Sequence, residues 1–267
     1  MHRFQATVVI LTCALISPSV LFADDDSSGP LFMKDMLGEG DFFEPWGIGF
    51  DFFTMDQPYK IKSLQFDLPG VSLPDPSLLQ IDNEIQHLDL KLDVWLTPFL
   101  NVFGVLGYVD GDTVVDFSQA PITGLPISQL PPISYDGTVY GGGVNLIYGS
   151  DKWFGALTTT WTEADLSGDF DSSVTSLAIQ PRLGLIRDKW QFWVGGMYLD
   201  TEEDHSGSID FRIPGVPLVP FSVELEGAKK WNTAVGVGYT FSTRAHLTLE
   251  FGFGDRDHTL FNYTFRF

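Results

Sequence analysis

HTLFNYTFRF, residues 258–267, is the stretch that decides the fold. Polar side chains separate its aromatic rings, which occupy alternate positions: Phe261, Tyr263, Phe265 and Phe267. Because successive side chains of a strand point to opposite faces, the stretch predicts a strand with one aromatic and one polar face. Residues at a chain terminus are usually frayed and polar, so a row of rings here indicates an apolar environment. We expect that environment to be lipid.

The same period of two recurs along most of the chain. In QHLDLKLDVWL, residues 86–96, leucines alternate with Asp89, Lys91 and Asp93. HLTLEFGFG (246–254) and WNTAVGVGYTF (231–241) repeat the arrangement, with an apolar face opposite a polar or small one. Such alternation is typical of half-buried strands. We predict strands at 46–55, 84–96, 101–111, 137–148, 152–163, 174–187, 190–201, 229–241, 245–254 and 258–267. Pro181 falls within one of them and is expected at a bulge or near a margin.

The connections between these strands alternate in length. Tight turns are expected at TPFLN, GSDK, RDK and STRA, whereas residues 56–83, 112–136, 164–173 and 202–228 form longer connections. An even number of strands, with short periplasmic turns and long external loops, is typical of bacterial outer-membrane barrels. The predicted fold is therefore all-β: a transmembrane antiparallel up-and-down β-barrel of about ten strands. If two hairpins from the long loops joined the wall, the barrel would have about twelve strands.

The first residues have the layout of a secretory signal peptide. Arg3 precedes an apolar run over residues 6–15, and Ala23 precedes three aspartates. This run is too short to span a bilayer as a helix. We predict a signal peptide at 1–23, an N-terminal periplasmic or lumenal segment at 24–45, and the transmembrane β-barrel at 46–267. A lipoprotein anchored at Cys13, the single cysteine, is the alternative, and ILTCALIS fits it poorly.

Composition narrows the possible partners. The chain has 35 Asp and Glu residues against 15 Lys and Arg, a formal net charge of −20, whereas proteins that bind nucleic acid are basic. After the signal peptide, no apolar stretch approaches the roughly 20 residues of a transmembrane helix. Aromatic residues make up 14% of the chain, while disordered chains contain few. We therefore expect a folded β-rich domain that does not bind nucleic acid.

Alternation alone does not separate a membrane barrel, whose apolar face points outward, from a secreted lipocalin-like barrel, whose apolar face points inward. The tryptophans favour the membrane barrel, because several stand beside tight turns, where an aromatic girdle meets the membrane interface. We predict girdle residues on the periplasmic side at Trp46, Trp153, Trp190 and Phe267, and on the outer side at Trp161 and Trp231.

LFNYTFRF, residues 260–267, resembles the C-terminal strand signature of Gram-negative outer-membrane proteins. The resemblance implies a location in the bacterial outer membrane, reached by secretion through the inner membrane. It also implies partners: the barrel-assembly machinery and periplasmic chaperones during biogenesis, and outer-membrane lipids with lipopolysaccharide afterwards. A closed barrel leaves no strand edge unpaired in the hydrocarbon, so Phe267 is expected beside the first strand, near Trp46.

The polar faces of the predicted strands point into the lumen. Charges there must pair or be hydrated, which gives either a salt-bridged network that fills the barrel or a thin polar path. Barrels of about eight strands are filled by side chains, whereas 16–18 strands leave an open channel. We predict an outer-membrane barrel with a narrow polar lumen, acting as a passive small-solute pore or as an envelope structural protein. The predicted lumen charges are Asp51, His87, Asp89, Lys91, Asp93, Arg182, Glu250 and Arg266.

Catalysis has weaker support in the sequence. EEDHSGS and DRDH place His205 and His258 next to aspartates, but adjacent residues of a strand face opposite sides. We expect both histidines in solvated loops, and we expect no enzyme, no metal site and no cofactor. The alternatives are a surface adhesin or ligand-binding barrel that acts through its long acidic external loops, and an outer-membrane hydrolase.

Overall fold

The computed structural model describes residues 29–36, 43–66, 79–116, 118, 132–168, 170–209 and 218–267. The predicted signal peptide and parts of the longest predicted loops lie outside the described residues. No helix within the described residues is long and apolar enough to cross a membrane. A 3-10 turn, η1 Lys34–Met36, precedes strands β1 Trp46–Phe66, β2 Gln80–Thr97, β3 Leu100–Asp116, β4 Ile133–Gly149, β5 Trp153–Gly168, β6 Phe170–Arg187, β7 Trp190–Ile209, β8 Val219–Gly227, β9 Trp231–Ser242, β10 Ala245–Phe253 and β11 Asp257–Arg266.

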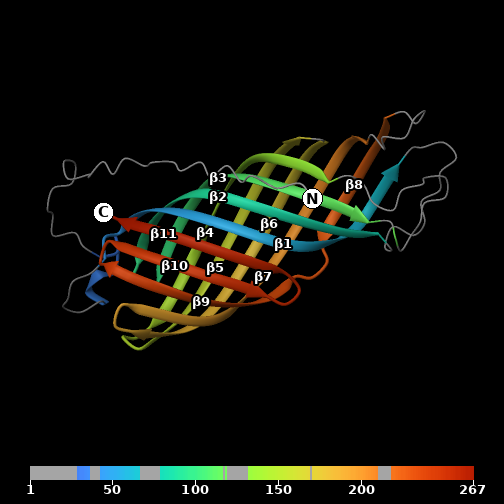
Figure 1. The fold of residues 1–267 in the computed structure, drawn as a ribbon. Helices are drawn as coiled ribbons and strands as arrows, with labels where there is room; N and C mark the ends of the chain where they lie inside the picture. Colours follow the sequence, from blue (N-terminus) through green and yellow to red (C-terminus); the bar gives the residue numbers. More distant parts are fainter. Residues whose placement is uncertain are drawn as a thin grey trace, which may run out of the picture.

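Ten of these strands close into a ring (Figure 1), because β1 pairs antiparallel with β11 as well as with β2. The N–H of Phe267 donates to the carbonyl of Trp46 across 3.0 Å, so these residues lie side by side as predicted. The closed ring confirms the predicted barrel and leaves its strands without an exposed edge. We call the end that holds the turns at 98–99, 150–152, 188–189 and 243–244 the turn end, and the opposite end the loop end.

An additional strand changes the ring at the loop end. Strands β9, β10 and β11 have 12, 9 and 10 residues, whereas β1 and β7 have 21 and 20 and run past them. Strand β8 fills the gap, pairing with β7 on one side and with β1 on the other. The wall is thus a ring of β1 to β8 at the loop end. The prediction of a loop over 202–228 is wrong where β7 continues and β8 forms, because the projecting edges of β1 and β7 need backbone partners.

The strands run beyond most of their predicted loop-side ends, and the alternation inverts along the way. Near the turn end, Leu88 and Leu92 are 59% and 56% exposed, while Asp93 on the opposite face is buried. Toward the loop end, Val109 is buried and its neighbour Asp110 is exposed. Where the exterior meets water instead of lipid, apolar side chains are more stable inside the barrel. The inner clusters of this upper part contain Val109, Tyr135, Val139, Ala164 and Leu166, and Tyr59, Ile81 and Leu225.

Pro181 lies in the middle of β6. Strand β6 pairs with β7 in the same register before and after Pro181, as Ile179↔Tyr198 and Arg182↔Gly195 show. The pairing is missing only between these two residue pairs. The predicted bulge or marginal position of Pro181 is therefore wrong. The strand accommodates this residue because the ladder toward β7 is interrupted there, so the missing N–H of proline is not required.

Candidate functional site

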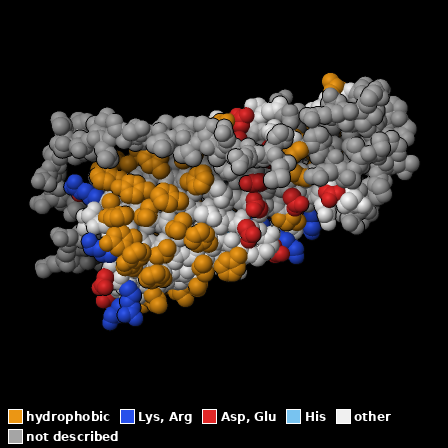
Figure 2. Space-filling view, viewed as in Figure 1, with side chains coloured by type: hydrophobic (Ala, Val, Ile, Leu, Met, Phe, Trp, Pro, Cys, Tyr) orange, Lys and Arg blue, Asp and Glu red, His pale blue; other side chains and the backbone are white. Residues whose placement is uncertain are grey.

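The exterior of the barrel carries an apolar belt next to the turn end (Figure 2). All five tryptophans of the predicted girdle point outward and are between 42% and 58% exposed, and Phe267 is partly exposed beside Trp46. Trp153 and Trp190 begin their strands at the turn end, whereas Trp161 lies on the same outer face of β5 as Trp153, toward the loop end. The spacing from Trp153 to Trp161 corresponds to the roughly 9–11 residues with which a tilted strand crosses a bilayer.

Aromatic contacts outline two levels at the margins of this belt. At the turn end, the ring of Tyr239 lies 4.7 Å from Trp190 and 4.8 Å from Phe241. At the other margin, Tyr198 and Trp231 lie 5.5 Å apart. Two aromatic levels around an apolar belt are the arrangement by which transmembrane barrels meet both membrane interfaces. The fold is therefore that of a transmembrane antiparallel β-barrel.

Charge differs between the two sides of the belt. Figure 2 shows both signs of charge on each side, with Lys and Arg side chains more numerous at the turn end and Asp and Glu side chains more numerous beyond the other margin. The basic residues of the turn end are Lys152, Arg187, Lys189 and Arg244. Outward carboxylates beyond the belt include Asp56, Glu84, Asp110, Asp136, Asp165, Glu202, Asp204 and Glu224.

Inside the barrel, the group nearest to the turn end is centred on Arg266. Its Nη2 donates to Asp93 Oδ1 across 2.7 Å, and Asn101 Nδ2 donates to the same oxygen across 2.6 Å. The guanidinium also lies 5.8 Å from the ring of Phe43 and 5.7 Å from that of Trp95. This group lies inside the lumen where it meets the turns.

A second group lies deeper in the lumen, around Glu250. Arg182 donates to both carboxylate oxygens, across 2.6 and 3.0 Å, and the indole nitrogen of Trp193 donates across 2.6 Å. Arg182 also reaches Thr158 Oγ1 at 3.1 Å, and His258 Nε2 lies 3.8 Å from the carboxylate. Glu250 is 1% exposed. Such a charge is tolerated in a dry site only because several donors surround it.

The remaining predicted lumen charges form a third group on β1 and β2. Lys91 Nζ lies 3.5 Å from Asp51 Oδ2, and Asn262 also donates to Asp51. His87 Nδ1 lies 3.9 Å from Asp89 Oδ1, an oxygen with no hydrogen-bond donor among the described residues. All the predicted lumen charges thus point inward. They form three separate groups rather than one continuous network.

A polar layer that we did not predict lies at the loop end, around Glu203. This carboxylate accepts from the hydroxyl of Tyr59, and His205 Nε2 lies 2.9 Å from its other oxygen. Beside it, Tyr135 donates to Asn83 Oδ1 across 2.6 Å. These residues were missed because their segments were assigned to long loops or to strand ends. The available signal was that Met55, Gln57 and Tyr59 alternate with Asp56, Pro58 and Lys60 across the predicted end of the first strand.

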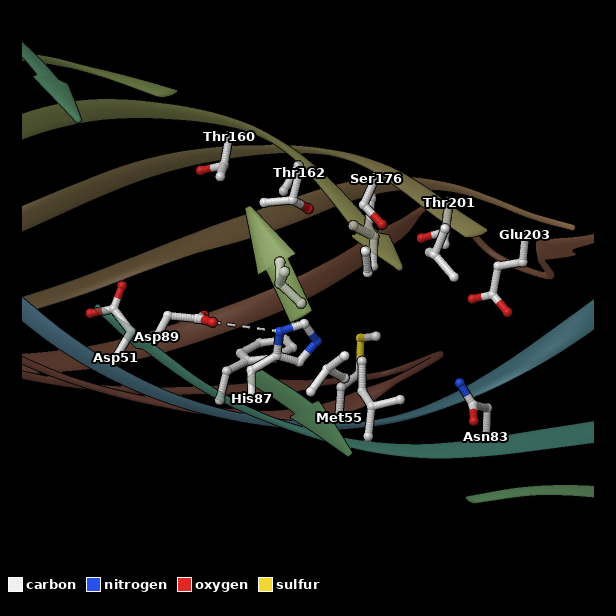
Figure 3. Close-up of a pocket in the computed structure, with 18 of the residues that line it drawn as sticks. Asp51, Met55, Asn83, His87, Asp89, Thr160, Thr162, Ser176, Thr201 and Glu203 are labelled. Carbon is white, nitrogen blue, oxygen red and sulfur yellow. Dashed lines mark ion pairs between the residues drawn. The ribbon is translucent and has the colours of Figure 1, made fainter. Parts of the chain in front are cut away.

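A cavity of about 210 Å³ lies between the polar groups of the lumen and this upper layer. Figure 3 shows Asp51, His87 and Asp89 at one end of the cavity and Asn83, Thr201 and Glu203 at the other. Its wall is mostly apolar and carries several hydroxyl groups. The apolar residues include Phe53, Met55, Ile85, Val139, Leu166, Met197, Leu199 and Leu260, and the hydroxyls belong to Tyr59, Tyr135, Thr160, Thr162, Ser176 and Thr201.

The expectation that His205 and His258 are solvated is wrong. Both point into the lumen and are 5% and 4% exposed. His205 lies between Glu203 and Ser172, and His258 lies between Glu250 and Asn232, whose side-chain nitrogen is 3.3 Å away. Their neighbouring aspartates, Asp204 and Asp257, are exposed on the outer face. The alternation rule was correct for both pairs. Strand β7 continues past its predicted end at 201 and so includes His205, whereas His258 lies at the start of the strand predicted at 258–267.

Comparisons with known proteins identify barrels of similar architecture. No protein-family model and no curated protein matches the chain. Among solved structures, OprG of Pseudomonas aeruginosa is 14% identical, with 84% of this chain and 98% of that chain covered and a TM-score of 0.42. The β domain of the Bordetella autotransporter BrkA is 13% identical, with 84% of this chain and 100% of that chain covered and a TM-score of 0.43. The outer membrane protease OmpT of Escherichia coli is 8% identical, with 86% of this chain and 99% of that chain covered and a TM-score of 0.42. At these values the likeness carries no information about what this chain does.

Proposed function

We propose that the chain is a non-enzymatic integral barrel of the bacterial outer membrane, with its turn end in the periplasm and a small-solute route that side chains close in this conformation. The apolar belt and its two aromatic levels support insertion into a bilayer. Outer-membrane lipids with lipopolysaccharide are the proposed lasting partners. The barrel-assembly machinery and periplasmic chaperones are the proposed partners during biogenesis.

The observation that carries the solute route is the cavity of about 210 Å³ between polar groups of the lumen. Packed protein interiors contain few voids larger than a water molecule, so an unfilled space of this size needs a reason. The Arg182–Glu250 pair lies toward the turn end, and Glu203 and Tyr59 lie toward the loop end. A solute would enter this space when one of these polar layers opens.

Planar-bilayer recording tests the route. The wild-type protein should give rare, small conductance steps because the polar layers close the lumen. The double variant Arg182→Ala and Glu250→Ala removes one layer without leaving an unpaired buried charge, and it should give larger and more frequent steps. The matched control is Lys230→Ala with Asp200→Ala, which removes an ion pair of 2.8 Å at the outer surface.

The outcomes separate a pore from an envelope structural protein. Larger steps in the lumen variant alone support the solute route. A bilayer that stays silent with the wild type and with both variants would contradict the route and leave a structural role. Insertion itself is tested separately, by heat-modifiable migration on a gel and by recovery in the outer-membrane fraction of cells.

A surface-binding role is the second candidate, and the acidic exterior beyond the belt favours it. Outward carboxylates follow one another on adjacent strands there, as with Asp110 and its register partner Asp136. Such a surface attracts basic partners through its summed field. Replacing Asp110, Asp136 and Asp165 by asparagine should weaken adsorption of a polylysine probe to cells that display the barrel. Equal adsorption would contradict this role.

A further inference from the structure

The lumen cavity has an unbalanced charge. Three carboxylates line it, those of Asp51, Asp89 and Glu203, while no Lys or Arg occurs among the described residues of its wall. Glu203 is engaged by Tyr59 and His205. At the other end lie Asp51 and Asp89 (Figure 3). Asp51 is engaged by Lys91 and Asn262, so the carboxylate oxygen without a hydrogen-bond donor among the described residues belongs to Asp89.

Asp51 and Asp89 are direct register partners in the β1–β2 pair. Like charges directly opposite each other on one face of a sheet destabilise it. Lys91 is the one ammonium group that approaches them within the described residues, and it lies 3.5 Å from Asp51. Asp89 Oδ1 has no hydrogen-bond donor among the described residues, and His87 Nδ1 is 3.9 Å away. A second cation in the cavity would relieve this repulsion.

The rest of the cavity fits an apolar body. Met55, Met197 and Leu199 form a buried cluster on its wall, with Phe53 and Ile85 packed against them. For comparison, an apolar cavity of about 150 Å³ holds benzene. A volume of about 210 Å³ therefore admits one aromatic ring with a short side chain. Sulfur and aliphatic side chains are favourable neighbours for such a ring.

We infer that this cavity is a binding site for a small organic cation: a primary amine whose apolar body has about the size of one aromatic ring. The ammonium group lies between Asp51 and Asp89, and the ring packs against Met55 and Leu199. This site goes beyond the proposed solute route, because binding does not require the lumen to conduct. A charged group in such a low-dielectric pocket gains more from its counter-charges than it would in water.

Calorimetric titration of the full chain in phospholipid nanodiscs tests the site, with the heats of empty nanodiscs subtracted. The probes are benzylamine, toluene and benzoate, which share a ring and differ in charge. Benzylamine should bind saturably with one site per barrel. Toluene should bind at least tenfold more weakly, and benzoate should give no heat above the empty nanodiscs. Benzylamine heats equal to those of empty nanodiscs would overturn the inference.

Variants locate the binding. Asp89→Asn keeps the shape of the side chain and should weaken benzylamine at least tenfold while leaving toluene unchanged. Ser176→Phe places a ring in the cavity and should abolish binding of both. Thr175→Phe adds the same ring one residue away, on the exposed outer face of β6, and should behave as the wild type.

Two further results would also overturn the inference. If Asp89→Asn and Thr175→Phe bind benzylamine equally well, the carboxylate does not select the ligand. If millimolar sodium chloride displaces benzylamine from the wild type as effectively as benzylamine itself competes, the site holds inorganic cations. Should Ser176→Phe lose heat-modifiable migration and so fail to fold, the comparison of Asp89→Asn with the wild type decides the question.

Discussion

Arg182 on β6 donates to both carboxylate oxygens of Glu250 on β10, across 2.6 and 3.0 Å. These strands do not pair with each other, since β7 and β9 lie between them in the ring. The bidentate contact therefore joins parts of the wall that no backbone ladder connects. Its planar geometry and paired charges make it one of the stronger polar contacts available to a protein.

The first prediction concerns this pair. Glu250→Ala leaves Arg182 buried without its counter-charge and removes the acceptor of Trp193, so it should lower the free energy of unfolding by about 3–5 kcal/mol. The double variant with Arg182→Ala should cost less than the sum of the two single variants, because no lone charge remains. Urea unfolding in lipid vesicles, followed by tryptophan fluorescence, measures both. Strictly additive costs would show that the two residues do not interact.

A second prediction tests which part of the exterior meets lipid. Val194 lies in the middle of the belt segment of β7 and is 61% exposed. Val194→Arg should lower the free energy of unfolding by about 2–4 kcal/mol, the cost of Arg at the bilayer midplane. Asp204→Arg, on the same face of β7 beyond the belt, is the control and should change it by about 0.5 kcal/mol or less. Equal effects of the two variants would contradict the position of the membrane.

A third prediction concerns the junction between β8 and the short strands. Arg256, in the turn between β10 and β11, is 2% exposed and donates to the carbonyls of Met197, Lys229 and Lys230 across 3.2 to 3.3 Å. Burial lowers the pKa of its guanidinium. Arg256→Ala removes the donors of these three contacts, although the carbonyl of Lys230 keeps its bond from the N–H of Leu199, and it should cost about 1–3 kcal/mol.

Hydrogen exchange locates that effect. Amides of β8 should exchange faster in Arg256→Ala, while amides of β4 in the belt should be unchanged. Arg256→Lys should not restore the protection, because a single ammonium group cannot reproduce the planar fork of donors. Uniformly faster exchange over the whole barrel would indicate global destabilisation instead of loosening at the junction.

The alternation of residues predicted the barrel wall, since each inward position follows from the period of two alone. It placed Arg182 and Glu250 inside, yet it could not pair them, because the pairing depends on which inward residues share one level of the ring. Strand β8 was missed although Val219, Phe221, Val223 and Leu225 alternate with other side chains. Prolines nearby favoured a loop. In addition, an alternating strand turns its apolar face into the barrel where the exterior meets water, whereas it turns that face outward where the exterior meets lipid. Sequence alone does not state which solvent a strand meets.

The last prediction concerns Ser172, His205 and Glu203. The histidine contacts the serine on one side and the glutamate on the other, as in the triad of acyl-transfer enzymes. The geometry argues against catalysis: Ser172 meets Nδ1 and Glu203 meets Nε2, the reverse of that template, and Glu203 also holds Tyr59. The wild type and Ser172→Ala should therefore both hydrolyse p-nitrophenyl butyrate no faster than the solution without protein does. His205→Ala should lower the free energy of unfolding by about 1–3 kcal/mol, as a lost buried hydrogen-bond partner does. Esterase activity of the wild type that both substitutions abolish, with heat-modifiable migration intact, would instead make this barrel a hydrolase.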